Sequence, residues 1–330
     1  MCESLATHLE SRSWHVLATS HKRPRLQRLS DVLGTAWGGR HEYDVAVVEV
    51  FSGLAFVWAE AVCHLLTVLG KPYVLSLHGG NLPEFASRWK RRVDNLFVGA
   101  AAVVAQSGYL ASAVSARQEL VRLIPNAIDL HLYPFRPRLA PAPKLVWIRS
   151  FQETYNPSLA VQVVSRLKRE FPDVALDMIG PDKGDGSLRA TRDLAAQLEV
   201  EQNVVFHPAV PKQDVPQWLN RADLFLNTTN VDNTPVSVQE AMACGLCVVS
   251  TNVGGVPYLV RDQVEALLVP PRDADAMANA VRQVLIRPDL AAHLSRGARK
   301  RVEGMDWSRV VEAWELLLSS VSHGDPSKFR

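Results

Sequence analysis

The chain has 330 residues, of which 47% are hydrophobic, and its formal net charge at pH 7 is +2. A length beyond about 250–300 residues favours two domains over one, because single hydrophobic cores seldom grow further. The near-neutral charge gives no reason to expect a nucleic-acid partner, since domains that bind nucleic acids usually carry a strongly basic surface.

The first twenty residues are polar and lack the apolar core of a secretory signal. They predict a helix over about residues 2–11 and a strand over about residues 14–18. A doubly wound domain normally opens with a strand and a Gly-rich loop before its first helix. The first strand of such a domain is therefore missing from this sequence: either the chain as given starts too late, or the domain lacks that strand.

The longest apolar run extends over residues 51–70. It carries Glu60 and His64 near its centre, and a charged residue in the middle of a bilayer span is costly. The run therefore predicts a buried helix and not a membrane span.

Short apolar segments recur along the chain, without the clean alternation of half-exposed strands, as is typical of strands covered on both faces. Helical patterns such as 157–170 and 274–286 lie between many of them. This alternation predicts an α/β fold with mostly parallel sheets. The strand candidates are residues 45–50, 73–77, 102–105, 145–148, 175–179, 204–206, 224–226, 247–250 and 266–269.

A Pro-rich segment divides the chain, with four prolines within residues 134–143. Such a density of proline can continue neither a helix nor a central strand. We expect an N-terminal Rossmann-like domain over 1–135, a linker over 136–143 and a second Rossmann-like domain over 144–305. A final helix within 306–330 is predicted to bury a wide apolar stripe. The stripe consists of Trp307, Val310, Val311, Trp314, Leu317 and Leu318.

The four cysteines, Cys2, Cys63, Cys244 and Cys247, are few for this length and do not have the spacing of a disulfide framework. A reducing compartment is therefore the default. The last two form a C-x-x-C, but no thioredoxin-like context surrounds it and no further metal ligands lie nearby in the sequence. We expect this pair to pack between a helix and a buried strand.

The stretch 227–257 places its parts in an order that suits a phosphate site. A polar loop follows the strand candidate at 224–226, and ligands of open α/β sheets bind outside the carboxyl ends of strands. Pro235 fits the first turn of a helix, whose free N–H groups and partial positive charge attract phosphate. Gly254 and Gly255 would let backbone come close to the same phosphates.

Two acidic residues accompany this helix. Glu240 lies about one turn in, and its carboxylate can accept two hydrogen bonds from a ribose diol. Asp232 lies in the preceding loop and can hold a sugar hydroxyl. This order of parts suits a nucleoside diphosphate with a sugar attached, while a helix-surface acid and a helix-capping acid are the structural alternatives.

The same stretch closely resembles the donor-site signature of GT4-type retaining glycosyltransferases, which have the GT-B fold: it reads DNTPVSVQEAMACGLCVVSTNVGGVPYLV. That family carries Glu-x7-Glu, then Ala-Met-Ala-x-Gly-x-Pro-Val-Val and Gly-Gly. Here Asp232 replaces the first Glu, Cys247 replaces the Pro, and Glu240 keeps the second Glu. The resemblance implies two Rossmann-like doubly wound domains facing a cleft, a nucleoside-diphosphate sugar as donor, retention of configuration, and no metal or other cofactor.

The likeness covers most of the chain. The segment HGGNLPEF is similar to the N-domain loop of the family, which places His78 near the transferred sugar and Gly79 and Gly80 near its phosphates. The segment WIRSF resembles the strand end whose arginine, here Arg149, grips the donor diphosphate. The helix after residue 306 would cross back to the N-domain.

The resemblance also implies that the donor contacts the turn at the start of the helix. Asn233 and Thr234 can present backbone N–H groups there, although an ordinary turn is the structural alternative. Pro235 and Val236 complete the implied donor contacts.

Two departures from the family pattern bear on activity. Family members usually carry a Lys about five residues after the arginine, whereas this chain has Glu153, Thr154 and Tyr155 there, and Lys183 is expected to stand in partly. The missing first strand also removes its Gly-rich loop. Both departures favour the alternative of a degenerate, non-catalytic homologue that binds a nucleotide or a partner.

Two basic clusters, HKRPR at 21–25 and RWKRR at 88–92, lie in the expected N-domain. A solvated face is the structural alternative, and contact with an anionic membrane is the functional one, worth about 1 kcal/mol for each Lys or Arg. We expect a cytoplasmic protein in peripheral contact with the inner face of the cytoplasmic membrane, where a lipid-linked acceptor would lie.

The sequence therefore predicts an enzyme that moves a sugar from a nucleoside-diphosphate sugar to a carbohydrate or lipid-linked acceptor, as in polysaccharide or glycolipid synthesis. Arg149 and the helix N-terminal amides would stabilise the leaving diphosphate, and His78 and Asp232 would orient the sugar. A sugar-nucleotide epimerase or hydrolase on the same fold is a further alternative, for which no acid–base set can be assigned. A dinucleotide dehydrogenase is disfavoured, because no G-x-G-x-x-G follows any strand.

Overall fold

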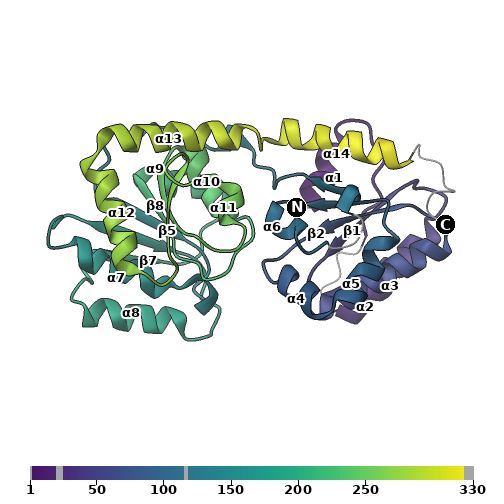
Figure 1. The fold of residues 1–330 in the computed structure, drawn as a ribbon, viewed down its shortest axis with the longest axis horizontal. Coiled ribbons are helices and arrows are strands. Elements are labelled where there is room, and N and C mark those ends of the chain that lie inside the picture. The colour runs from purple at the N-terminus through teal and green to yellow at the C-terminus, as the bar shows by residue number, and fades with distance from the viewer. Residues whose placement is uncertain (1, 20–24, 115–117, 323–330) are drawn as a thin grey trace. The chain divides into compact units, whose positions relative to one another are not determined.

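A computed structural model describes residues 2–19, 25–114 and 118–322 (Figure 1). The chain divides into two compact units. Unit 1 comprises Met1–Ala127 together with Trp307–Arg330, and unit 2 comprises Ile128–Asp306. The basic cluster at 21–25 lies outside the described residues except for Arg25, so the structure does not bear on it.

Unit 1 is built on a four-stranded parallel sheet with the order β1-β2-β3-β4. Its central strands β2 and β3 are buried along their whole length, which explains their unbroken apolar sequence. The strands are β1 (Ala46–Val50), β2 (Tyr73–Leu77), β3 (Ala102–Ala105) and β4 (Val121–Leu123).

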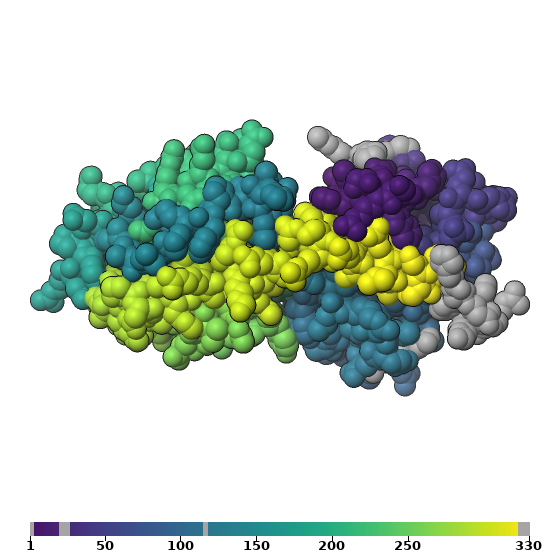
Figure 2. All heavy atoms as spheres, turned by 90° about the horizontal axis from the view of Figure 1, so that it is seen from above, coloured from purple at the N-terminus to yellow at the C-terminus, as the bar shows by residue number. Residues whose placement is uncertain are grey.

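Helices cover both faces of this sheet. The helices described in unit 1 are α1 (Cys2–Glu10), α2 (Arg25–Gly38), α3 (Leu54–Val68), α4 (Leu82–Arg88), α5 (Lys90–Val98), α6 (Gly108–Ala111), the 3₁₀ helix η1 (Gln118–Leu120) and α14 (Trp307–Ser322). One core cluster joins the sheet to α3 and α5, and another joins it to α1 and α14. Figure 2 shows α14 in yellow lying against α1 in purple. The predicted stripe on α14 is buried, with Trp314 only 1% exposed.

Two expectations for unit 1 need correction, and one strand was missed. Residues 14–18 form no strand, because Trp14 packs into the α1–α14 cluster and its Nε1 donates to Glu315 on α14 at 3.1 Å. Helix α3 is buried on one face only, and Leu54 on its other face is 76% exposed. Strand β4 was not predicted, because its three residues, with Arg122 between Val121 and Leu123, do not form an apolar run. Among the described helices, none is long and apolar enough to cross a membrane.

Unit 2 contains a six-stranded parallel sheet with the order β10-β9-β8-β5-β6-β7. Its strands are β5 (Lys144–Ile148), β6 (Ala175–Ile179), β7 (Val204–His207), β8 (Leu224–Asn227), β9 (Cys247–Thr251) and β10 (Ala266–Val269). Numbered within the unit, this is the 3-2-1-4-5-6 order of a doubly wound fold. The nine strand candidates between residues 45 and 269 are therefore all present, whereas the strand predicted at 14–18 is not.

Two layers of helices sandwich this sheet. The helical segments of unit 2 are η2 (Leu130–Leu132), η3 (Glu153–Tyr155), α7 (Pro157–Leu167), α8 (Ser187–Gln197), η4 (Lys212–Asp214), α9 (Val215–Arg221), α10 (Val236–Cys244), α11 (Val256–Leu259), α12 (Ala274–Ile286) and α13 (Pro288–Glu303). Helices α7, α8 and α12 share one core cluster with the sheet, and α9, α10 and α11 share the other.

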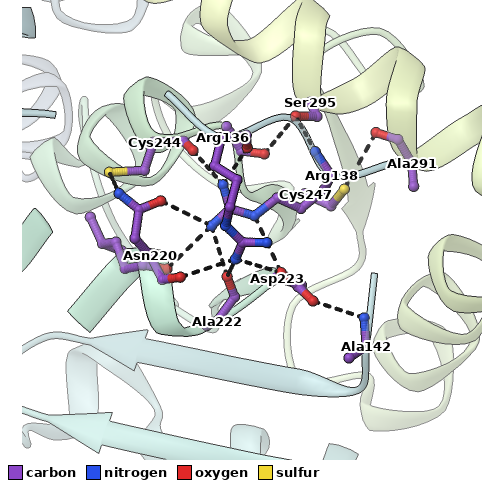
Figure 3. Close-up of polar contacts among 12 residues, drawn as sticks. Arg136, Arg138, Ala142, Asn220, Ala222, Asp223, Cys244, Cys247, Ala291 and Ser295 are labelled. Atoms are coloured by element: carbon purple, nitrogen blue, oxygen red, sulfur yellow. Dashed lines mark hydrogen bonds and ion pairs between the residues drawn. The ribbon is translucent and has the colours of Figure 1, made fainter. Parts of the chain in front are cut away.

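The Pro-rich segment 136–143, expected to be a separate linker, is part of unit 2. Arg138 is 1% exposed, and its Nη2 donates to the carbonyl of Ala222 at 2.8 Å (Figure 3). Asp223 accepts from Arg136 Nη2 at 2.7 Å and from the Ala142 backbone N–H at 2.8 Å. The prolines prevent regular secondary structure, but the polar groups between them dock the segment onto the unit.

The C-x-x-C pair lies beside this network and packs as predicted (Figure 3). Cys244 ends α10, Cys247 begins β9, and both side chains are fully buried. Burial raises the pKa of each thiol to about 12. Both therefore stay protonated at neutral pH and behave as small apolar groups.

Candidate functional site

The site of unit 2 forms where the strand order reverses. Strands β5 and β8 are neighbours in the sheet, and the chain leaves β5 toward α7 on one face and β8 toward α10 on the other. Ligands of doubly wound sheets bind at such a switch point, outside the carboxyl ends of the strands. The loops after β5 and β8 are therefore the place to look for a site.

These two loops are tied to each other by hydrogen bonds. The hydroxyl of Thr228, after β8, accepts from Trp147 Nε1 at 2.8 Å and donates to the carbonyl of Tyr155 at 2.7 Å. The backbone N–H of Asn230 donates to the carbonyl of Thr154 at 2.8 Å. These hydrogen bonds fix the loop after β5 against the loop after β8, and the two loops carry Arg149 and Asp232.

Arg149, from the loop after β5, and Asp232, from the loop after β8, form an ion pair. Arg149 Nη2 donates to Asp232 Oδ2, and the second carboxylate oxygen accepts from the backbone N–H of Asn233 at 2.8 Å. The guanidinium also lies over the ring of Tyr155, 4.6 Å from its centroid. Burial raises the pKa of Asp232 above its usual range, although the Arg149 charge pulls it down. The pair places one cation and one carboxylate at the switch point.

Gly254 and Gly255 support this loop by leaving room for its backbone. A Cβ on Gly254 would lie 2.0 Å from the carbonyl oxygen of Asp232, and one on Gly255 would lie 2.0 Å from that of Asn233. The Gly255 N–H also donates to the Asp232 carbonyl at 3.0 Å. These glycines therefore shape the loop that carries Asp232, and the approach of donor phosphates to them stays a prediction.

Helix α10 begins directly after this loop. Pro235 is its N-cap, Val236 is its first residue, and no side chain caps its N-terminus. Asn233 and Thr234, in the turn before it, are both at most 9% exposed. Because the first N–H groups of a helix lack partners within the helix, this end attracts an anion.

Glu240 lies within α10 and is 7% exposed. Its Oε1 accepts from the hydroxyl of Tyr133 at 2.7 Å. Burial raises the pKa of the Glu240 carboxyl, while the Tyr133 hydrogen bond and the charges of Lys212 and Arg149 lower it. The carboxylate, the two cations and the Tyr133 hydroxyl therefore belong to one electrostatic neighbourhood.

Sequence reasoning did not identify Tyr133 or Lys212 as members of this site. Tyr133 is 107 residues from Glu240 in the chain, and no local motif announces the contact. Lys212 begins η4 after β7 and acts on Glu240 through its charge. Lys183, the expected substitute for the missing lysine, lies exposed in the loop after β6. Its side chain makes no ion pair with any described residue.

The candidate residues of unit 1 lie at the end of β2. His78 Nε2 is 3.1 Å from Ser76 Oγ and 3.6 Å from Glu49 Oε1, and its ring stacks on Phe51 with centroids 5.1 Å apart. Burial lowers the pKa of His78, and the Glu49 charge only partly offsets this effect. The imidazole is therefore neutral at pH 7, so it can position a hydroxyl but supplies no positive charge.

Gly79 and Gly80 follow His78 in a tight turn into α4. Gly79 has a φ of 88°, a value that L-residues with side chains rarely adopt. The carbonyl of Gly80 accepts from the hydroxyl of Tyr109 at 2.9 Å. The backbone conformation at Gly79 and the Tyr109 hydrogen bond to Gly80 together fix the turn that follows β2.

Two solved structures share the fold of this chain. HepE from Anabaena, crystallised with UDP, aligns with a TM-score of 0.77 over 95% of this chain and 88% of its own, at 22% sequence identity. Sucrose-phosphate synthase from Thermosynechococcus elongatus aligns with a TM-score of 0.79 over 97% and 92%, at 18% identity. At these identities the likeness establishes the fold, which is that of the GT-B glycosyltransferases.

Curated relatives include proteins named D-inositol 3-phosphate glycosyltransferase. The one from Saccharomonospora viridis is 28% identical over 282 residues, which is 78% of this chain and 64% of the relative. The one from Mycobacteroides abscessus is 31% identical over 178 residues, which is 53% of this chain and 38% of the relative. The chain thus spans about two thirds or less of the length of these two relatives.

One protein-family model matches most of unit 2, including the Pro-rich segment before β5. Residues 136–301, half of the chain, match the model of the family described as glycosyl transferases group 1. This range contains Arg149 after β5, Asp232 before α10, and Glu240 on α10. On this evidence the chain belongs to the glycosyl transferases group 1 family.

Proposed function

We propose that the chain is a glycosyltransferase that takes a sugar from a nucleoside-diphosphate donor and transfers it to a carbohydrate or lipid-linked acceptor. One observation carries the proposal: a cation, two carboxylates and an uncapped helix N-terminus meet at the switch point of a doubly wound sheet. These are the groups that a diphosphate joined to a ribose and a sugar requires.

In this proposal Arg149 and the N-terminus of α10 bind the diphosphate. A guanidinium has five N–H donors, so Arg149 can bind phosphate oxygens while it keeps its bond to Asp232. The first N–H groups of α10, after Pro235, add a partial positive charge. Lys212 supplies the second cation that the family pattern places after the arginine. Together these groups would stabilise the negative charge that the leaving diphosphate gains, without a metal ion.

Glu240 binds the ribose diol in this proposal. A carboxylate has two oxygens and about four acceptor sites, and the Tyr133 hydroxyl uses one of them. The remaining acceptors can receive both hydroxyls of a diol. Asp232, in the loop before α10, holds a hydroxyl of the transferred sugar. In unit 1, the neutral imidazole of His78 is proposed to position a sugar hydroxyl at the end of β2.

The titles of similar structures support a uridine nucleotide as the first donor to test. HepE was crystallised with UDP and with UDP-glucose. The names of the curated relatives support a phosphorylated polyol, beside sugars and lipid-linked sugars, among the acceptors to test. Transfer is proposed to retain the anomeric configuration. Peripheral contact with an anionic membrane through the cluster at 88–92 is proposed with it.

One observation favours a second candidate, a non-catalytic homologue that only binds a nucleotide. The position of the family's lysine is occupied by residues such as Tyr155, whose ring lies against the Arg149 guanidinium, so one phosphate cation is lacking there. Such a protein would bind the nucleotide but would not turn over a nucleotide sugar.

A thermal shift panel tests the proposal. The panel holds UDP, GDP, ADP and their glucose conjugates, with metal chelated. A donor at about 100 times its dissociation constant should stabilise the protein by about 2.7 kcal/mol. The shift should vanish in Glu240→Ala and persist in Glu201→Ala, which alters an exposed glutamate of the same unit. No shift with any nucleotide would overturn the proposal, and a shift without product formation would select the non-catalytic candidate.

A further inference from the structure

One buried side chain, Tyr133, contacts the proposed donor site from outside its donor contacts. We propose that Tyr133 is a positioning residue of the donor site. Its hydroxyl engages one oxygen of Glu240 and so fixes the direction in which the other oxygen meets the diol of the donor. This inference rests on the proposed function and assigns a role to a residue outside the matched range 136–301.

Core packing and backbone hydrogen bonds hold Tyr133 in place, in addition to its hydrogen bond to Glu240. It is 2% exposed and packs in the core cluster that contains Val238 and Met242 of α10. Its backbone N–H donates to the carbonyl of Leu130 at 3.2 Å, and its own carbonyl accepts from Arg299 Nη1 at 3.3 Å. The phenol therefore reaches Glu240 from a fixed anchor.

The hydrogen bond from Tyr133 gives the two carboxylate oxygens of Glu240 different roles. Oε1 accepts from Tyr133, while Oε2 accepts no hydrogen bond from the described part of the chain. A buried carboxylate without a partner would be free to rotate and would be costly to keep charged. With one oxygen fixed, the second is presented in one direction only, which lowers the entropy cost of binding a diol.

The charge of Glu240 depends on the same contact. Four groups act on the carboxyl or feel its charge: the Tyr133 phenol after η2, Lys212 at the start of η4, Arg149 after β5, and the Cys244 thiol on α10 itself. The Tyr133 hydrogen bond lowers the pKa of Glu240 against the effect of burial. Burial and the Glu240 charge raise the pKa of Tyr133, so the phenol remains a donor throughout the working pH range.

The test is the affinity of UDP for wild type and Tyr133→Phe, measured by calorimetry at several values between about pH 5.5 and about pH 8.5. Without the hydroxyl, Glu240 takes up its proton at higher pH and the carboxylate can rotate. UDP binding should weaken about tenfold at the acidic end, the size expected for one hydrogen bond to a charged group. The loss should shrink as the pH rises.

A matched control separates positioning from stability. Tyr73→Phe removes a hydroxyl of similar burial in unit 1 and should leave UDP affinity and its pH profile unchanged. In a Glu240→Gln background, Tyr133→Phe should add no pH-dependent loss, because no carboxylate remains to titrate. A loss in Tyr133→Phe that is equal at every pH would overturn the positioning role and leave a merely structural one.

A ligand-free readout makes failure of this inference distinguishable from failure of the proposed function. The carboxyl ¹³C signal of Glu240, assigned by its absence in Glu240→Gln, should titrate at higher pH in Tyr133→Phe than in wild type. An unchanged midpoint with normal UDP binding would overturn this inference alone. If wild type bound no nucleotide, the donor site and the positioning role would both be overturned.

Discussion

The sheets of the two units differ in the order of their strands. In the described part of unit 1 the strands follow one another as β1-β2-β3-β4, whereas in unit 2 the order reverses between β5 and β8. The reversal sends neighbouring loops to opposite faces, and a basic and an acidic side chain, Arg149 and Asp232, meet between them. The unit 1 site has a stacked, neutral His78 at one strand end. Strand order, more than strand composition, determines where a charged site can form.

Burial acts in opposite directions on the two sites. It lowers the pKa of His78 and raises the pKa of Glu240, so each group is pushed toward its neutral form. Only at Glu240 do nearby cations, Arg149 and Lys212, and a donated hydrogen bond counter this effect among the described groups. Unit 2 therefore offsets part of the effect of burial on its carboxyl, and unit 1 keeps its imidazole neutral at pH 7.

The largest effect is expected from breaking the buried network that holds unit 2 together. Arg138→Met leaves the carbonyls of Cys244 and Ala222 without a donor that they have in wild type. We expect the free energy of unfolding to fall by about 3 kcal/mol. Arg136→Met is the matched control: Arg136 also bonds Ala222 and Asp223, but its side chain is 48% exposed, and it should lose about 1 kcal/mol or less. Urea unfolding monitored by tryptophan fluorescence measures both, and equal losses would contradict the account.

Glu240→Gln should weaken the donor site but strengthen the ligand-free fold. A carboxyl whose folded pKa is raised gives stability below its unfolded pKa and loses it as the pH rises through the folded value. The neutral amide does not have this loss, so the variant should gain stability over wild type from acidic to neutral pH. UDP affinity should fall by about tenfold or more, since two hydrogen bonds to a charged group are weakened. A variant that is less stable than wild type at every pH would speak against a strained, buried charge.

Lys212→Ala should weaken UDP binding more than Lys183→Ala. Lys212 acts on Glu240 through its charge, while Lys183 is exposed and without an ion pair among the described residues. We expect about a threefold loss for Lys212 and little change for Lys183, and the former should shrink at high salt. Calorimetry at two ionic strengths measures this. The reverse ranking would contradict a role for Lys212 and would support Lys183, the residue expected from the sequence.

The smallest effect is expected at His78, with a pH dependence of opposite sign. Its folded pKa lies below the ordinary value of 6.5, so its contribution to stability is present above that value and is lost as the pH falls toward the folded one. His78→Gln should abolish this loss and flatten the melting temperature on the acidic side. A profile identical to that of wild type would mean that Glu49 cancels the effect of burial.

Much of the fold could be predicted from the sequence, because buried parallel strands are short, continuously apolar segments. The nine strand candidates between residues 45 and 269 all exist, whereas β4, with exposed Arg122 at its centre, carried no such signal. The segment 14–18 has strand composition, but its Trp14 is anchored to α14. Local composition could not reveal that tertiary contact.

The candidate site likewise contains residues that local motifs predict and residues that only the fold brings in. Arg149, Asp232 and Glu240 lie in local motifs at strand ends and at a helix start, so their neighbourhood could be anticipated. Tyr133 reaches Glu240 only through the folded course of the chain, and Lys212, in the segment after β7, acts on Glu240 through its charge. The role of Gly254 and Gly255 also depended on the fold, because the backbone beside them, that of Asp232 and Asn233, lies more than twenty residues earlier in the chain.

A crystal structure of the protein with UDP would test the central claim most directly. The account predicts the diphosphate at the N-terminus of α10 beside Arg149, and the ribose diol on Glu240 with the Tyr133 bond intact. UDP bound away from the switch point of unit 2, or a ribose that makes no contact with Glu240, would contradict it.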